Sequence, residues 1–381
     1  MRPSTRLILA SILCLAAAAC GDNLESGTAG GTADAGDQAD AGPPFDVTER
    51  EWTWYPLEGN TCMDGSPTGI GLNLDFASDK LVVFLEGGGA CFNSESCITV
   101  AHQDGFGEAE MTDLAGYLDA SGILDRDDPD NPLAGWSYVF IPYCTGDVHA
   151  GAQPDGVGGR DYVGYGNVTR AVTLVAERMG GSLSQVLLTG QSAGGFGAAY
   201  NYDQVATIFG DIDVPVDLLD DSGPPMSNTY LTPCFQEMVR TRWNLEATIP
   251  ADCEECVDED GGGLIHLVDA MSAKYAERRI GIISSLRDNT IRQFYGFGYP
   301  DCENPEWPMA AEVFQAGIEE LRDEILSPLD NARAYTIDDT GHVWTDNALG
   351  SVEVDGVTLA AWITALIEGA EGWESVAPPP E

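Results

Sequence analysis

The sequence predicts an α/β fold with a mainly parallel sheet and helices on both faces. Six short apolar runs have the length and composition of strands, and the segments between them include helical patterns. Alternating strands and helices are typical of parallel sheets, because a parallel connection needs a crossover long enough to hold a helix. The predicted strands are residues 80–89, 136–144, 185–190, 216–223, 279–285 and 333–339.

Two of the connecting segments have clear helical spacing. The apolar residues of 168–175 fall on one helix face, with Asn167 as the expected N-cap, and residues 313–325 show the same spacing. No repeat or long linker interrupts residues 46–381, so we expect one large domain. Residues 223–263 exceed an ordinary crossover and predict a cap or a decorated loop near the site.

The N-terminal segment predicts export. Arg2 and Arg6 precede an apolar run that ends in "LAAAAC" and is too short to span a membrane comfortably. The pattern resembles a bacterial lipoprotein signal, which implies removal of residues 1–19 and a lipid on Cys20. We therefore expect attachment to the bacterial cell envelope, at the outer membrane or cell surface, with secretion as the alternative. Residues 20–45, rich in Gly, Ala and Asp, are expected to form a flexible tether.

Eight of the ten cysteines lie beyond this leader. In an exported chain an even number of cysteines predicts disulfides that staple the loops, although sequence alone does not choose the pairing. A zinc site built on "CEEC", residues 253–256, is the alternative, but no second close pair of cysteine or histidine stands nearby to complete four ligands. We expect no metal and no cofactor.

The composition is strongly acidic. The net charge is −45, and Lys80 and Lys274 are the only lysines. A surface dominated by Asp and Glu repels polyanions, which excludes nucleic acid as a partner. We expect a monomer that touches the membrane only through its N-terminal lipid anchor.

The pentapeptide "GQSAG" places Ser192 between two glycines, after the predicted strand 185–190 and before a helical segment. A strand, a sharp turn and a helix in this order predict a nucleophile elbow, which lifts the serine hydroxyl out of the sheet. A glycine-rich turn with a structural serine is the alternative, because short motifs of this kind also occur by chance.

A serine nucleophile needs a base, and the base needs an acid to orient it. His266 lies in an apolar helical context and is expected to be packed, and His102 lies in a loop. His342 follows the last predicted strand and is the candidate base. Asp288 follows the predicted strand 279–285 and is the candidate acid, with Asp221 as the alternative.

Three glycines, Gly87, Gly88 and Gly89, stand at the end of the first predicted strand. Their backbone N–H groups can approach a ligand closely and are candidate oxyanion donors, together with the N–H of Ala193. A glycine loop after a strand can also bind phosphate. Neither G-K-[ST] nor G-x-G-x-x-G is present at this loop, which favours the oxyanion interpretation.

Four stretches, "CMDGSPTG", "VVFLEGGGACFNSESC", "IPYCTGDVHAG" and "GQSAGGFGAAYN", together resemble the pectin acetylesterase and Notum family of α/β-hydrolases. The resemblance covers most of residues 60–345. It implies an α/β-hydrolase-like fold with Ser192 as nucleophile, Asp288 as acid and His342 as base. It places the oxyanion donors at Gly88, Gly89 and Ala193.

The same resemblance implies two of the disulfides. One joins Cys62 to Cys144, and the other joins Cys91 to Cys97. The partners of the other four cysteines stay open.

We expect an extracytoplasmic serine carboxylesterase that removes O-acetyl or other short acyl groups from an acetylated polysaccharide. Gly89 and Ala90 replace an aromatic pair common in animal members, which argues against an acyl pocket of the animal kind. A Notum-like lipid deacylase and a non-catalytic glycan-binding surface lipoprotein are the alternatives. His149, close to Cys144, is expected to line the cleft and contact substrate, with a structural role as the alternative.

Overall fold

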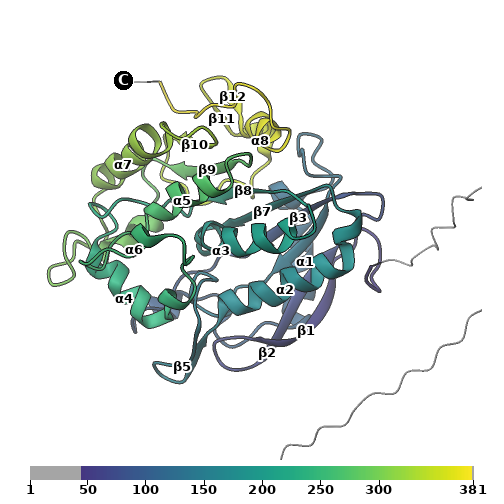
Figure 1. The fold of residues 1–381 in the computed structure, drawn as a ribbon, viewed down its shortest axis with the longest axis horizontal. Helices are drawn as coiled ribbons and strands as arrows, with labels where there is room; N and C mark the ends of the chain where they lie inside the picture. The colour runs from purple at the N-terminus through teal and green to yellow at the C-terminus, as the bar shows by residue number, and fades with distance from the viewer. Residues whose placement is uncertain (1–43, 380–381) are drawn as a thin grey trace, which may run out of the picture. The chain divides into compact units, whose positions relative to one another are not determined.

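The centre of the molecule is a sheet of eight strands in the order β1-β2-β4-β3-β7-β8-β9-β10 (Figure 1). The computed structural model describes residues 44–379, so the expected signal peptide, Cys20 and nearly all of the tether lie outside the described residues. The strands of the sheet are β1 (Thr53–Thr61), β2 (Pro67–Asn73), β3 (Lys80–Leu85), β4 (Ser137–Ile141), β7 (Gln185–Gln191), β8 (Val216–Asp221), β9 (Ile280–Ser285) and β10 (Ala332–Ile337).

The strands from β4 to β10 in this order run parallel to one another, and all six coincide with predicted strands. At one edge β1 pairs antiparallel with β2, and β2 pairs antiparallel with β4. The sequence analysis did not predict this pair. β1 is largely half-buried or exposed, and β2 carries Gly69 and Gly71, so neither has a continuous apolar run. A side chain at Gly69 would overlap the backbone of Tyr55, so the close pairing requires glycine there.

Helices lie on both faces of the sheet, and α2 and α3 pack side by side on one of them (Figure 1). The helices are α1 (Glu108–Leu118), α2 (Gly164–Met179), α3 (Ala193–Gly210), α4 (Pro233–Trp243), α5 (His266–Lys274), α6 (Ile291–Gly296), α7 (Ala311–Glu320), continued by a π-helical stretch at Leu321–Leu326, and α8 (Leu359–Ile367). Short 3-10 helices are Ser96–Thr99, Gly122–Leu124, Gly180–Ser182, Leu245–Ala247, Glu254–Cys256 and Leu349–Ser351. Two small sheets pair β5 (Gln153–Gly156) with β6 (Arg160–Tyr162) and β11 (Glu353–Val354) with β12 (Val357–Thr358).

The central strands are buried on both faces. Along β3, Leu81 and Val83 join a core with α2 and α3, whereas Val82 and Phe84 join a second core with α1 and α8. Successive side chains of a strand point to opposite faces, so a strand between two helix layers needs apolar residues at every position. This explains the continuous apolar runs in the sequence and confirms the predicted α/β-hydrolase-like fold.

The prediction that Asn167 caps its helix is wrong. α2 begins at Gly164, so Asn167 lies within its first turn and is buried. Its side-chain amide donates to the carbonyl oxygen of Thr61 at 2.8 Å and accepts from the Thr61 nitrogen at 3.3 Å. The residue therefore bonds α2 to the end of β1 instead of capping its own backbone.

Four disulfides staple the loops, including the two that the family resemblance implied. The pairs are Cys62 with Cys144, Cys91 with Cys97, Cys234 with Cys302, and Cys253 with Cys256. The zinc site considered at residues 253–256 is therefore replaced by a disulfide between the same two cysteines. Within residues 44–379, no group of three or more His, Cys, Asp or Glu side chains is placed to hold a metal ion. No helix in this part of the chain is long and apolar enough to cross a membrane.

We expect the Cys62 to Cys144 disulfide to contribute more to stability than the Cys253 to Cys256 disulfide. The first joins residues 82 apart in the sequence, and the second joins residues 3 apart. In the chain-entropy account, closing the longer loop stabilises by about 4 kcal/mol, and the shorter one by roughly half of that. Urea unfolding of the two double alanine variants, without reductant, measures both losses. Equal losses would contradict this account.

Candidate active site

Ser192 occupies a sharp turn between β7 and α3. Its backbone has φ 58° and ψ −120°, a strained conformation for a residue with a side chain. The Ser192 nitrogen donates to the carbonyl oxygen of Asp221 at 2.8 Å. Side chains at Gly190 or Gly194 would overlap the carbonyl oxygen of Leu85 at the end of β3. The glycines on both sides of the serine are thus required by the close approach of two strand ends.

Asp288 and His342 meet near the carboxyl ends of β9 and β10. Asp288 is fully buried, and its Oδ2 lies 2.7 Å from Nδ1 of His342. Its other oxygen accepts hydrogen bonds from the nitrogens of Thr290, at 2.7 Å, and Ile291, at 2.9 Å. These contacts fix the carboxylate, so the Nδ1 proton of His342 is held toward it and Nε2 is left as the basic nitrogen.

Asp221, the alternative acid, forms hydrogen bonds with residues other than His342. Its Oδ2 accepts from the nitrogens of Trp344 and Thr345 and from the Thr345 hydroxyl, at 2.7 to 2.8 Å. Its Oδ1 accepts from the Ser222 hydroxyl at 2.9 Å. Asp221 therefore holds the segment that follows His342, and the acid paired with the histidine is Asp288.

The glycine loop after β3 lies against the Ser192 turn. A side chain at Gly87 would meet the carbonyl oxygen of Gln191 and the Ser192 side chain. Gly88 and Gly89 have φ of +141° and +81°, so the loop takes a path that side chains disfavour. Gly89, Ser192 and Ala193 line one pocket, so two of the candidate oxyanion donors lie at the same pocket as the serine. Ala193 is the first residue of α3, and the backbone N–H groups in the first turn of a helix have no hydrogen-bond acceptor within the helix.

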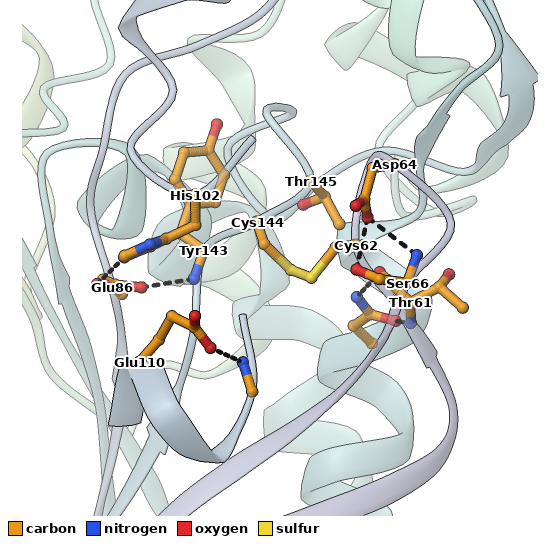
Figure 2. Close-up of a disulfide and its surroundings, with 12 residues drawn as sticks. Thr61, Cys62, Asp64, Ser66, Glu86, His102, Glu110, Tyr143, Cys144 and Thr145 are labelled. Atoms are coloured by element: carbon orange, nitrogen blue, oxygen red, sulfur yellow. Dashed lines mark hydrogen bonds and ion pairs between the residues drawn. A yellow bond between two sulfur atoms is a disulfide. The ribbon is translucent and has the colours of Figure 1, made fainter. Parts of the chain in front are cut away.

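Glu86 fixes the start of this loop, and the sequence analysis missed it. Its Oε2 accepts from the Tyr143 nitrogen at 2.8 Å, and its Oε1 lies 3.1 Å from Nε2 of His102. Figure 2 shows the Glu86 carboxylate pointing to both partners. Burial of the His102 ring opposes its protonation, but the hydrogen bond and charge of Glu86, together with Glu110, outweigh burial and raise the pKa of His102. A charged residue directly after an apolar strand was the signal available in the sequence.

His149 does not reach the pocket surface, contrary to the expectation that it contacts substrate. Its exposed fraction is 1%, and its Nε2 lies 2.8 Å from the carbonyl oxygen of Glu86. Burial lowers the pKa of His149 to about 4, although the bond to Glu86 opposes the shift. The ring is therefore neutral near pH 7 and donates to this carbonyl. The structure supports the alternative role, in which His149 holds the residue before the glycine loop.

The remaining histidine, His266, was expected to be packed. It is the first residue of α5 instead, and 37% of its side chain is exposed. Its Nδ1 lies 3.6 Å from Oδ2 of Asp269 on the next helical turn.

An apolar pocket of about 150 Å³ opens beside Ser192. Its walls come from α3 to α6 and from β8 and β9, so the segment 223–263 supplies a large part of them. Gly89 and Ala90 also line it. Because both residues are small, side chains from elsewhere in the chain form most of the pocket wall. Aromatic and aliphatic wall residues include Phe196, Phe235, Trp243, Leu267, Ile282 and Phe294.

The eight-stranded sheet, the turn at Ser192 and the Asp288 to His342 pair define an α/β-hydrolase. Comparison with known proteins agrees with this class. The family model for pectinacetylesterase matches residues 55–294, which is more than half of the chain, and the chain belongs to this family.

The curated relatives found by sequence carry the name palmitoleoyl-protein carboxylesterase NOTUM. The mouse protein is 36% identical over 160 residues, which are 41% of this chain and 31% of the relative. The Drosophila melanogaster protein is 29% identical over 214 residues, or 51% of this chain and 31% of the relative. The matched segment thus spans about a third of the relatives' length. A solved structure of the Wnt deacylase Notum from Drosophila has a TM-score of 0.63 at 20% identity, covering 86% of this chain and 96% of that one.

We expect acid to destabilise the protein partly through His149. Its pKa is about 4 in the folded chain against an ordinary value of 6.5, so unfolding takes up a proton between these pH values. Stability from the neutral ring is present above pH 6.5 and is lost as pH falls toward 4, by about 3 kcal/mol at most. A His149→Gln variant keeps a donor for Glu86 but does not titrate. Urea unfolding of both proteins at pH 7, 6 and 5 measures the difference, and parallel losses would contradict this prediction.

Proposed function

We propose that the protein is a serine carboxylesterase, with Ser192 as nucleophile, His342 as base and Asp288 as the acid that orients it. The observation that carries the proposal is the strained turn that presents Ser192 at a pocket, in a fold where Asp288 holds Nδ1 of a histidine. His342 accepts the hydroxyl proton through Nε2 while the Ser192 oxygen bonds to the ester carbonyl carbon. It then donates this proton to the leaving alcohol, and an acyl-enzyme forms. Water activated by His342 releases the acid and restores the serine.

The negative charge on the carbonyl oxygen needs donors that are already in place. We assign this role to the backbone N–H groups of Gly88, Gly89 and Ala193. The contacts of Glu86 with Tyr143 and His102 support this assignment, because they keep the glycine loop from reorganising during the reaction.

The acyl group is proposed to be an apolar chain of about six carbons. An apolar cavity of about 150 Å³ holds a benzene molecule, so the pocket beside Ser192 has room for a similar number of carbons. An acetyl group would leave most of this space without contacts. It would therefore gain little of the binding free energy that burial of apolar surface in the pocket can supply. A palmitoleoyl chain, named for the NOTUM relatives, exceeds the same volume.

Removal of O-acetyl groups from a polysaccharide is the second candidate, and the description of the family model favours it. In either case the leaving group is an alcohol, and the protonation steps are the same. A non-catalytic glycan-binding protein is a weaker candidate, because binding alone gives no reason to maintain both a strained serine at the pocket and a histidine held by a buried carboxylate.

The setting proposed for this activity is outside the cytoplasm. Four disulfides support folding in an oxidising compartment. In this proposal, residues 1–19 are a leader that is removed, Cys20 carries a lipid and residues 20–45 form a tether. The hydrolase domain that follows is a monomer.

Ser192→Ala is expected to abolish both ester hydrolysis and labelling by a fluorophosphonate probe, because the attacking oxygen is removed. Ser184→Ala is the matched control, since Ser184 is an exposed serine at the other end of β7. Rates on p-nitrophenyl hexanoate and gel detection of the probe measure the two effects, with circular dichroism to check folding. Labelling that survives in the folded Ser192→Ala variant would exclude this residue as the nucleophile.

We expect kcat/KM on p-nitrophenyl esters to peak near hexanoate. Each methylene buried in the pocket contributes about 0.8 kcal/mol, so hexanoate can exceed acetate by up to about 200-fold. Dodecanoate should be poorer, because it overfills the cavity. Ala199→Phe fills the pocket from α3 and should move the optimum toward acetate. An optimum at acetate in the unmodified protein would favour the polysaccharide deacetylase instead.

A further inference from the structure

Asp220 is a carboxyl group in the wall of an otherwise apolar pocket. On β8, the side chains of Leu218 and Asp220 face the pocket, whereas Asp221 faces the other side of the sheet and bonds to the segment after His342. The same strand therefore carries two adjacent acids with different surroundings. Asp221 has four hydrogen-bond donors around it, and the function described above makes no use of Asp220.

The carboxyl of Asp220 is only half satisfied by the protein. It is fully buried, and its Oδ1 accepts from the Gly223 nitrogen at 2.8 Å. Its Oδ2 has no hydrogen-bond partner among the described residues. Burial raises the pKa of Asp220 well above its ordinary value, the neighbouring Asp221 adds to this, and the bond from Gly223 opposes it. Burial and one unpaired oxygen favour the protonated form of this carboxyl, and a protonated carboxyl carries an O–H donor.

Three aromatic side chains in the pocket wall have polar atoms with partners on the protein. The Tyr295 hydroxyl donates to the carbonyl oxygen of Pro224 at 2.6 Å, and the Trp243 indole donates to that of Cys91 at 2.9 Å. The Tyr200 hydroxyl reaches the carbonyl oxygen of Leu245 at 3.4 Å. Asp220 thus differs from these residues in keeping a side-chain oxygen without a partner among the described residues.

The position of Asp220 relates it to the acyl group. A side chain at Gly195 would collide with Oδ1 of Asp220, so the carboxyl packs against the first turn of α3. Gly195 is three residues after Ser192, or one helical turn, which is about 5 Å. Ser192 and Asp220 line the same pocket, so an acyl chain that enters it from Ser192 shares this pocket with the carboxyl.

We propose that Asp220 is a specificity-determining residue, which donates a hydrogen bond to an oxygen carried on the acyl chain. The inference rests on the proposed esterase function and names its substrate class more narrowly. The favoured acyl group is of medium length and bears an oxo, hydroxyl or ether oxygen a few carbons from the ester. A purely hydrocarbon chain leaves the buried donor without an acceptor, and an unpaired buried donor disfavours binding.

The test compares p-nitrophenyl hexanoate with its 3-, 4- and 5-oxo derivatives. An oxo group only accepts hydrogen bonds, so a preference for it requires a donor on the protein. The proteins are the unmodified chain, Asp220→Asn, which keeps an N–H donor of nearly the same shape, and Asp220→Leu, which keeps the volume without a donor. Comparing variants on one ester cancels differences in the intrinsic reactivity of the esters.

For at least one oxo ester, the ratio of its kcat/KM to that of hexanoate should fall about tenfold in Asp220→Leu, the effect of losing one hydrogen bond. Asp220→Asn should retain most of the ratio, and hexanoate itself should be hydrolysed by all three proteins. Ratios that do not differ between the unmodified chain and Asp220→Leu would overturn the inference while leaving the esterase intact. Failure to hydrolyse any of the esters would instead refute the proposed function.

Discussion

The active site depends on how closely the turn at Ser192 approaches the end of β3. Side chains at Gly190 or Gly194 would overlap the carbonyl oxygen of Leu85, and one at Gly87 would meet the carbonyl oxygen of Gln191. Backbone therefore packs directly on backbone at this point. As a result, the glycine loop and the N-terminus of α3 meet at Ser192. The strain of the positive φ at Ser192 is tolerated because the surrounding sheet leaves no other path.

Glu86 fixes the start of this loop through two histidines whose pKa values shift in opposite directions. His149 lies in the core and contacts the carbonyl oxygen of Glu86, so burial keeps it neutral. His102 contacts the carboxylate, and that negative charge outweighs its partial burial. The backbone and the side chain of one residue are thus held by different partners. The loop that follows is fixed in position before substrate binds, which suits a site that stabilises developing charge.

Successive side chains of β8 point to opposite faces of the sheet, so two adjacent aspartates on this strand have different roles. Asp221 points to one face and fixes the segment after His342, and Asp220 points to the other and borders the pocket. The pocket is completed by α4, α5 and α6, which come from chain beyond the strand. Small residues at Gly89 and Ala90 do not remove the pocket, because its walls are built from these helices. Family membership defines the hydrolase scaffold, while these local walls give the pocket beside Ser192 its apolar character.

The six parallel strands, the turn at Ser192 and a short set of candidate acids and histidines could all be predicted from the sequence. These features are local: a strand buried on both faces must be apolar throughout, and a strained turn must be flanked by glycines. Asp288 was the preferred acid in the sequence, but only the packed structure shows its contact with His342 and the separate contacts of Asp221. Only the packed structure shows that His149 is buried against the carbonyl of Glu86 and that an apolar pocket borders Ser192. Each of these depends on residues that are distant in the chain. Spacing along a chain gives the direction of side chains within one element, but it does not give the distance between elements until they pack.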